Sequence, residues 1–86
     1  AGDAYITNYP NPFSSETTIK YYSDGGHVNI SILDTHGRII TNLVNTSIAQ
    51  GTHEVQFNAM GLKPGTYYCQ FQNNMMSQTK SLLKIR

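Results

Sequence analysis

Apolar and polar side chains alternate at every second position along most of the chain, and no segment sustains the spacing of a helix. The clearest case is HVNISIL, where Val28, Ile30 and Ile32 share one face and Asn29 and Ser31 share the other. Such alternation, broken by turn residues about every eight to twelve positions, is typical of an all-β sandwich or barrel. The pattern therefore predicts a fold built from short strands.

The same alternation marks further segments, each long enough for one short strand. They span residues 5–9, 17–23, 38–44, 52–57, 66–71 and 77–86. The side chains expected to face inward on the clearest of these are Ile19, Tyr21, Val55, Phe57, Tyr67, Cys69 and Phe71. The double isoleucine of residues 38–44 leaves the inward face of that segment open. Two packed sheets bury seven strands economically, so we predict an all-β, seven-stranded, immunoglobulin-like antiparallel β-sandwich.

The last predicted strand differs from the others because charged and apolar side chains mix on one of its faces. The residues expected to face inward are Ser81, Leu83 and Ile85, and those expected to face outward are Lys80, Leu82, Lys84 and Arg86. Outward lysines are an ordinary way to blunt an edge strand. An apolar Leu82 between two of them gains nothing from the core, which indicates a recognition surface.

Turn-forming residues separate the predicted strands. SDGGH, residues 23–27, predicts a hairpin between the second and third strands, because both glycines can take positive φ. DTHG, residues 34–37, has the Asp and Gly that suit the first and fourth positions of a type I turn. Residues 45–51 are expected to form a loop, and Asn73-Asn74 a chain reversal. The residues expected to serve the backbone in this way are Asp34, Gly37, Gly51 and Gly65.

The stretch NYPNPF places a rigid segment after the first predicted strand. Pro10 and Pro12 each fix their own φ and push the preceding residue toward extended geometry. We expect Asn11 to be held extended and Phe13 to turn into the core as a lid. The segment also fixes where the folded domain begins relative to any linker before it.

Composition narrows the classes of function. With 86 residues the chain forms one domain. A formal net charge of +1 and six scattered basic residues argue against nucleic acid as a partner. No apolar run approaches the length of a bilayer span, so no membrane insertion is expected. The sequence opens on Ala-Gly rather than Met, and we interpret it as a piece of a longer polypeptide.

No group of residues has the spacing of a catalytic or metal site. His27, His36 and His53 lie in separate turns and strand starts, where histidines are usually solvated or hydrogen-bonded. Cys69 alternates in phase with Tyr67, so it is expected to be a buried, inert hydrophobe. The sequence predicts no enzyme, no catalytic residue, no metal and no cofactor.

Five motifs occur in an order and spacing that resemble one known family. They are YPNPF, TTIKYY, VNISILDTHGRII, GTHEVQFNAMGLKPGTYYCQF and KSLLKI. Together they resemble the type A C-terminal sorting domain of cargo proteins of the type IX secretion system in Bacteroidota. The resemblance covers residues 8–86, with residues 1–7 as the end of a linker and the start of the first strand. The residues of the structural motifs are Pro10, Asn11, Pro12, Phe13, Asp34, Gly37, Gly51, Gly65 and Tyr67.

The resemblance implies a role in secretion. A domain of this family follows an N-terminal cargo domain and directs it through an outer-membrane translocon, with a shuttle barrel as a further partner. A sortase-like surface peptidase then usually removes the domain, with the cleaved bond near residues 1–5, and the cargo is released or attached to lipopolysaccharide. The residues that the resemblance assigns to translocon recognition are Lys80, Leu82, Leu83, Lys84, Ile85 and Arg86.

Two other interpretations stay open. A fibronectin-like or carbohydrate-binding β-sandwich module of a secreted enzyme would share the fold and would need exposed aromatics on one sheet. Tyr22 and Tyr68 face outward by the alternation, although Trp is absent. An exposed last strand also predicts weak pairing of two copies through its edge.

Overall fold

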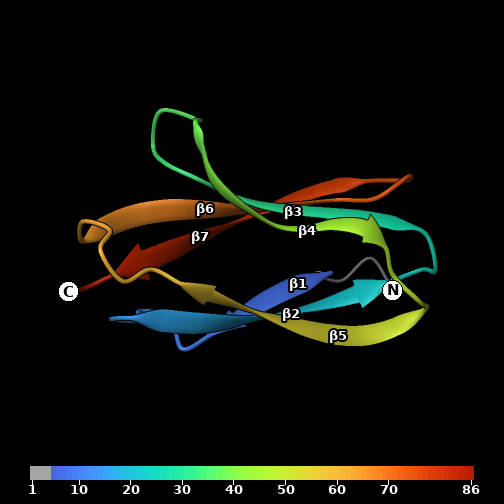
Figure 1. Cartoon of the computed structure of the whole chain (residues 1–86), viewed down its shortest axis with the longest axis horizontal. Helices are drawn as coiled ribbons and strands as arrows, with labels where there is room; N and C mark the ends of the chain where they lie inside the picture. Colours follow the sequence, from blue (N-terminus) through green and yellow to red (C-terminus); the bar gives the residue numbers. More distant parts are fainter. Residues whose placement is uncertain (1–4) are drawn as a thin grey trace.

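The structure, a computed structural model, describes residues 5–86 and contains seven β-strands and no helix in that range. The strands are β1 (Ile6–Tyr9), β2 (Glu16–Ser23), β3 (His27–Leu33), β4 (Ile39–Ser47), β5 (Gly51–Asn58), β6 (Gly65–Gln72) and β7 (Ser77–Lys84). They form a three-stranded sheet of order β1-β2-β5 and a four-stranded sheet of order β4-β3-β6-β7, with all neighbours antiparallel. Figure 1 shows the two sheets as packed layers, which confirms the predicted immunoglobulin-like sandwich.

The connection over residues 23–27 is not the predicted hairpin, because β2 and β3 belong to different sheets. Gly25 does take a positive φ of 94°, but the turn leads the chain from one layer to the other. The Ser23 Oγ accepts a hydrogen bond from Gly25 N at 3.0 Å and donates one to the Ile48 carbonyl at 2.9 Å. β2 already has β1 and β5 as neighbours, so β3 pairs in the opposite layer instead.

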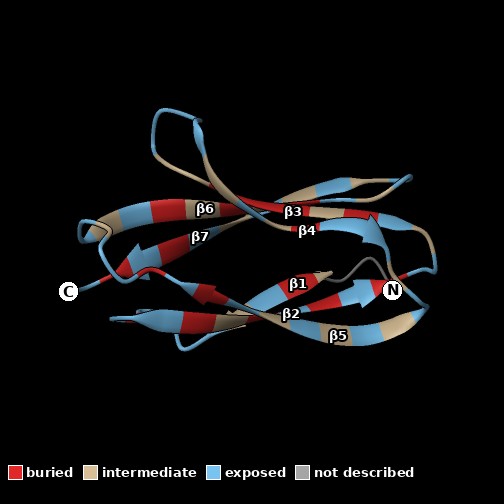
Figure 2. Cartoon of the chain, viewed as in Figure 1, coloured by how far each residue is buried: buried red, intermediate tan, exposed pale blue. Residues whose placement is uncertain are grey.

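The core lies between the two layers, where the buried segments of the strands face one another (Figure 2). Its buried apolar side chains are Ile6, Phe13, Ile19, Tyr21, Val28, Ile30, Ile32, Val44, Phe57, Ala59, Tyr67, Cys69, Phe71 and Leu82. Val55 is half-buried against them. The inward faces predicted for β2, β3, β5 and β6 are therefore confirmed.

β4 keeps no single alternation along its length, which explains its ambiguous sequence. Its pairing with β3 shifts register twice, so that Asn42 lies opposite Ser31 and Val44 lies opposite Ile30. Val44 faces the core, whereas the Asn42 side chain donates to Ser31 Oγ at 2.9 Å. The strand also runs to Ser47 and β5 begins at Gly51, so the loop predicted for residues 45–51 is confined to residues 48–50. β-Bulges allow these changes of face.

The face predicted for the last strand is inverted. Leu82 is 1% exposed and Lys84 is 5% exposed, although both were expected to point outward. Leu83 is 43% exposed and Ile85 is 54% exposed, although both were expected to point inward. Ser81, also expected inward, is exposed.

The turn between β6 and β7 sets this inversion. Residues 73–76 connect the two strands and place Tyr67 opposite Leu82 and Cys69 opposite Lys80. Directly opposite residues of an antiparallel pair share one face, and a shift of one residue would exchange the two faces. Two leucines stand side by side in this strand, so its own alternation fits either phase. The pairing with β6 decides between them.

Four residues of β7 face inward, and we call them the inner row: Gln78, Lys80, Leu82 and Lys84. Gln78 connects this strand to the start of the domain. Its side-chain Oε1 accepts hydrogen bonds from the backbone N–H of Tyr5 at 2.7 Å and of Ile6 at 3.1 Å. The hydrogen-bond capacity of these two amides is thereby satisfied beside the first strand. The first described residues consequently lie next to the beginning of β7.

Candidate functional site: the C-terminal strand and its edge

A short segment covers the outer edge of β7 near the C-terminus. We call this segment, residues 10–13, the strap. The Phe13 N–H donates to the Leu83 carbonyl at 3.0 Å, and the Ile85 N–H donates to the Phe13 carbonyl at 2.9 Å. These two bonds form an isolated parallel bridge between Phe13 and Lys84. The strap thus lies where a fifth strand of this four-stranded sheet would lie.

The side chain of Asn11 completes the cover of this edge. Its Nδ2 donates to the Ser81 carbonyl at 3.3 Å, and its Oδ1 accepts from the Leu83 N–H at 3.0 Å. Pro10 and Pro12 have no N–H group, so the strap backbone is short of donors. The carboxamide of Asn11 carries one donor group and one acceptor group, as a peptide group does. It therefore stands in for a missing peptide of the strap.

Two contacts hold the strap against the sandwich. Phe13 is 2% exposed and packs edge-to-face on Phe57 with 6.1 Å between ring centroids. The Thr17 hydroxyl donates to the Pro10 carbonyl at 2.7 Å. The peptide bonds before both prolines are cis. The expectation that Phe13 turns into the core as a lid is confirmed.

The six residues assigned to translocon recognition divide between two faces of the strand. Leu82 and Lys84 are buried and Lys80 is half-buried in the inner row. A lysine in such a row can bury its methylene stem while its ammonium group reaches water. The other three face solvent, and we call them the tail surface: Leu83, Ile85 and Arg86.

Asp34 closes the turn between β3 and β4, as predicted. The Gly37 N–H donates to the Asp34 carbonyl at 3.1 Å, and Gly37 has a φ of 80°, a conformation that favours glycine. The Asp34 carboxylate accepts from the Arg38 N–H at 3.0 Å and the His36 N–H at 2.8 Å, and it pairs with Arg38 Nε at 3.0 Å. These contacts, led by the Arg38 backbone bond, hold the pKa of Asp34 below its usual value.

We predict a pH-dependent effect of Asp34→Asn on stability. A carboxyl whose pKa is lower in the folded state stabilises the fold above its ordinary pKa of about 3.9, and this contribution is lost as the pH falls through the folded value. The melting temperature of the variant should therefore lie below that of the wild type at neutral pH. The difference should shrink as the pH is lowered below 4. Asp24→Asn, at another turn, is the control, and a pH-independent difference at position 34 would contradict the prediction.

Three further residues of the structural motifs, Tyr67, Gly51 and Gly65, also shape the path of the backbone. The Tyr67 hydroxyl donates to the Lys63 carbonyl just before β6, the arrangement of a tyrosine corner in immunoglobulin-like sandwiches. Gly51 and Gly65 each begin a strand with positive φ, of 132° and 144°. These positions shape the chain at the entries to β5 and β6.

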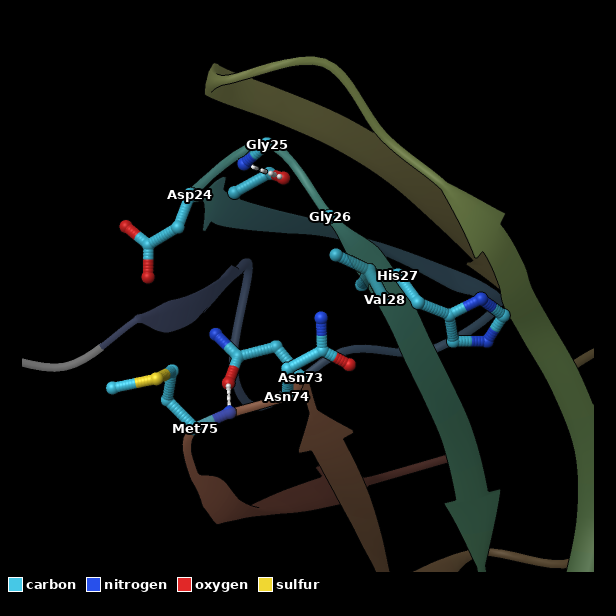
Figure 3. A pocket seen from close by; sticks show the side chains of 9 residues that line it. Asp24, Gly25, Gly26, His27, Val28, Asn73, Asn74 and Met75 are labelled. Carbon is cyan, nitrogen blue, oxygen red and sulfur yellow. Dashed lines mark hydrogen bonds between the residues drawn. The ribbon is translucent and has the colours of Figure 1, made fainter.

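A pocket of about 170 Å³ lies between the β2–β3 turn and the β6–β7 turn, at the end of β7 opposite to the tail surface. Figure 3 shows that the Asp24 carboxylate and the His27 ring, which both line it, point away from each other. The His27 Nε2 instead lies 2.7 Å from Asn45 Oδ1 on β4. The pocket therefore brings no acid and base together.

Other reactive side chains are separated as well. His53 Nε2 lies 2.8 Å from the Ala49 carbonyl, and its ring stacks on Tyr21. Burial raises the pKa of the Cys69 thiol to about 12, so the thiol stays protonated at neutral pH and packs as an apolar group. Within residues 5–86, no three side chains of His, Cys, Asp and Glu come together as a metal site would require. The same range has no helix long and apolar enough to cross a membrane.

The two outward tyrosines do not form a common surface. Tyr22 lies on β2 of the three-stranded sheet and packs edge-to-face on Tyr5, with 6.0 Å between ring centroids. Tyr68 lies on β6 of the other sheet. A flat platform for a sugar would need both on one face.

Fold and site together define an immunoglobulin-like β-sandwich with an apolar, solvent-facing C-terminal end. The model of the secretion system C-terminal sorting domain family matches residues 7–85, nearly the whole chain, and the chain belongs to this family. It is a C-terminal sorting signal for type IX secretion, so it acts on an attached cargo protein and marks it for export to the cell surface or beyond. A search of curated proteins found no match.

Sequence reasoning missed two residues of this site. Gln78 and the side chain of Asn11 both bond to backbone groups more than sixty positions away in the sequence. For Asn11 a signal was available: a carboxamide between two prolines is the only donor-bearing side chain in a segment short of N–H groups. For Gln78 we find none, because a polar residue at a strand start is ordinary.

Proposed function

We propose that the type IX machinery recognises this domain on its tail surface, Leu83, Ile85 and Arg86, while the inner row of β7 holds that surface in place. In this proposal Leu82 and Lys84 contribute through the fold, and Lys80 contributes from its half-buried position between Gln78 and Leu82 in the inner row. The outer-membrane translocon and the shuttle barrel are the partners that read the strand.

One observation carries the proposal: two large apolar side chains remain exposed at the end of the terminal strand. Leu83 is 43% exposed and Ile85 is 54% exposed, two positions apart and therefore on one side of the extended chain. Exposed apolar side chains grouped at one place mark interaction sites more often than isolated ones do. The adjacent Arg86 adds a positive charge.

The test is export of a fluorescent reporter fused ahead of the domain in a Bacteroidota host. Leu83→Glu with Ile85→Glu should reduce the extracellular reporter at least tenfold, because two charges replace the apolar contact. The melting temperature of the purified variant should stay close to that of the wild type, since exposed substitutions change stability by about 0.5 kcal/mol.

The matched control is Ile39→Glu, which charges a 65% exposed isoleucine on the opposite edge strand of the same sheet. This variant should be exported normally. Normal export of the Leu83 and Ile85 variant, or equal loss in the control, would rule out the tail surface as the signal.

The proposal extends to the fate of the domain. A sortase-like surface peptidase cuts ahead of it, near residues 1–5, of which residues 1–4 lie outside the described part of the chain. Residues 1–7 comprise the end of the linker and the start of the first strand, and residues 8–86 act as the sorting domain without catalytic activity. We do not extend the proposal to a homodimer through β7, because the strap occupies the edge of that strand from Ser81 to Ile85.

A further inference from the structure

The strap satisfies the β7 edge with groups that an incoming strand would also need. Four backbone groups are engaged in turn: the Ser81 carbonyl, the Leu83 N–H, the Leu83 carbonyl and the Ile85 N–H. An extended peptide that adds to a sheet edge forms its main-chain hydrogen bonds to the same outward groups. The strap and such a peptide therefore cannot bind this part of the edge together.

We propose that the strap is a releasable cover, which competes with an extended segment of the export machinery for the edge of β7. This inference rests on the proposed function, in which β7 is the strand that is read. It adds that reading begins with displacement of residues 10–13. In the resting domain the cover prevents edge-to-edge pairing with other chains, which exposed strand edges invite.

The way the strap is held makes release easier than opening of the sheet. Pro10, Asn11 and Pro12 are exposed, and two of the four bonds come from the single Asn11 side chain. Only Phe13 is anchored in the core. Segments with few buried contacts and solvent-exposed hydrogen bonds open at low free-energy cost, so the two Asn11 bonds should open first and the two bonds of the buried Phe13 last.

The edge also offers a place where displacement can start. The bonds of the strap reach from Ser81 to Ile85, so residues 77–80 of β7 lie beyond it. Within residues 5–86 no backbone bond reaches the outer edge of residues 77–80, so a peptide that first pairs with this stretch can extend toward the C-terminus and replace the strap bond by bond. A strand without proline would supply the backbone donors that the strap lacks.

The first test is amide hydrogen exchange on the purified domain. Asn11→Ala removes both side-chain bonds and should accelerate exchange of the Leu83 N–H about tenfold, with a smaller effect at Ile85. The Leu82 and Lys84 amides, which face β6, should keep their rates. Asn58→Ala, at the end of β5 in the other sheet, is the matched control, since it removes an exposed side-chain bond to the Met60 N–H. An unchanged exchange rate of the Leu83 N–H would contradict the proposal that the strap covers this edge.

The second test is export of the same reporter fusion. With the cover weakened, Asn11→Ala should be exported at least as well as the Asn58→Ala control. Loss of export in the Asn11 variant alone would show that the strap must stay in place, which overturns the proposal. If Asn11→Ala fails to fold, Asn11→Asp keeps the shape and the acceptor but loses the donor, and the same comparisons apply. Normal export of the Leu83 and Ile85 variant would instead contradict the proposed function, because that variant leaves Asn11 intact.

Discussion

Leu82→Ala is expected to lower the free energy of unfolding by about 2–5 kcal/mol. The side chain is 1% exposed and lies opposite Tyr67 on the inner face of the four-stranded sheet. Truncation removes its apolar contacts and leaves a cavity that close-packed neighbours cannot fully close. Total stability of a small domain is only about 5–15 kcal/mol, so the loss is a large share of it. Urea unfolding followed by circular dichroism measures the effect.

Leu83→Ala is the matched control, one residue along the same strand. Because Leu83 is 43% exposed, the change should cost less than about 1 kcal/mol. The sequence pattern alone predicted the opposite order for these two leucines. Equal costs, or a larger cost at Leu83, would contradict the register that places Leu82 in the core.

Phe13→Ala is expected to lower the free energy of unfolding by about 3–5 kcal/mol. The ring is 2% exposed and packs edge-to-face on Phe57, and aromatic pairs of this kind add about 0.5–1.5 kcal/mol to the burial. The substitution also removes the one buried side chain of the strap. Exchange of the Ile85 N–H, which donates to the Phe13 carbonyl, should therefore become faster than the global loss of stability explains.

The control for this variant is Tyr9→Ala, an aromatic residue near the strap that is 81% exposed. Its truncation should change the free energy of unfolding by about 0.5 kcal/mol or less. A Phe13 variant as stable as the Tyr9 variant would mean that the strap is not anchored in the core. Urea titrations of both proteins, fitted with a common slope, provide the comparison.

The sequence predicts the layers of this fold better than the connections between them. Alternation identifies the inward residues of β3 because Val28 and Ile30 stand between polar neighbours and Ile32 continues the same face. It fails for β7, where adjacent leucines fit both phases and the turn after β6 makes the choice. It also fails at residues 23–27, since a turn sequence specifies a reversal but not the sheet in which the chain continues.

The candidate site was predictable in its place but not in its geometry. The resemblance directed attention to the end of the chain, and the exposed Leu83 and Ile85 lie there. Which of the six residues face solvent depended on pairing with β6, a long-range property. The bonds of Asn11 to Ser81 and Leu83 join residues at least seventy positions apart, and no local pattern encodes such a contact.

The bond between Gln78 and Tyr5 places the first described residues at the opposite end of β7 from the tail surface, so two partners can bind the domain at once. Tyr5 lies beside Gln78 at the start of β7, and Leu83 and Ile85 follow Gln78 by five and seven residues, about 17 and 23 Å of extended chain at about 3.3 Å per residue. A peptidase that works upstream of Tyr5 and a receptor that grips Leu83 and Ile85 would therefore meet opposite poles of the sandwich. Cleavage of the cargo from the domain would therefore not require release of the tail surface by its receptor.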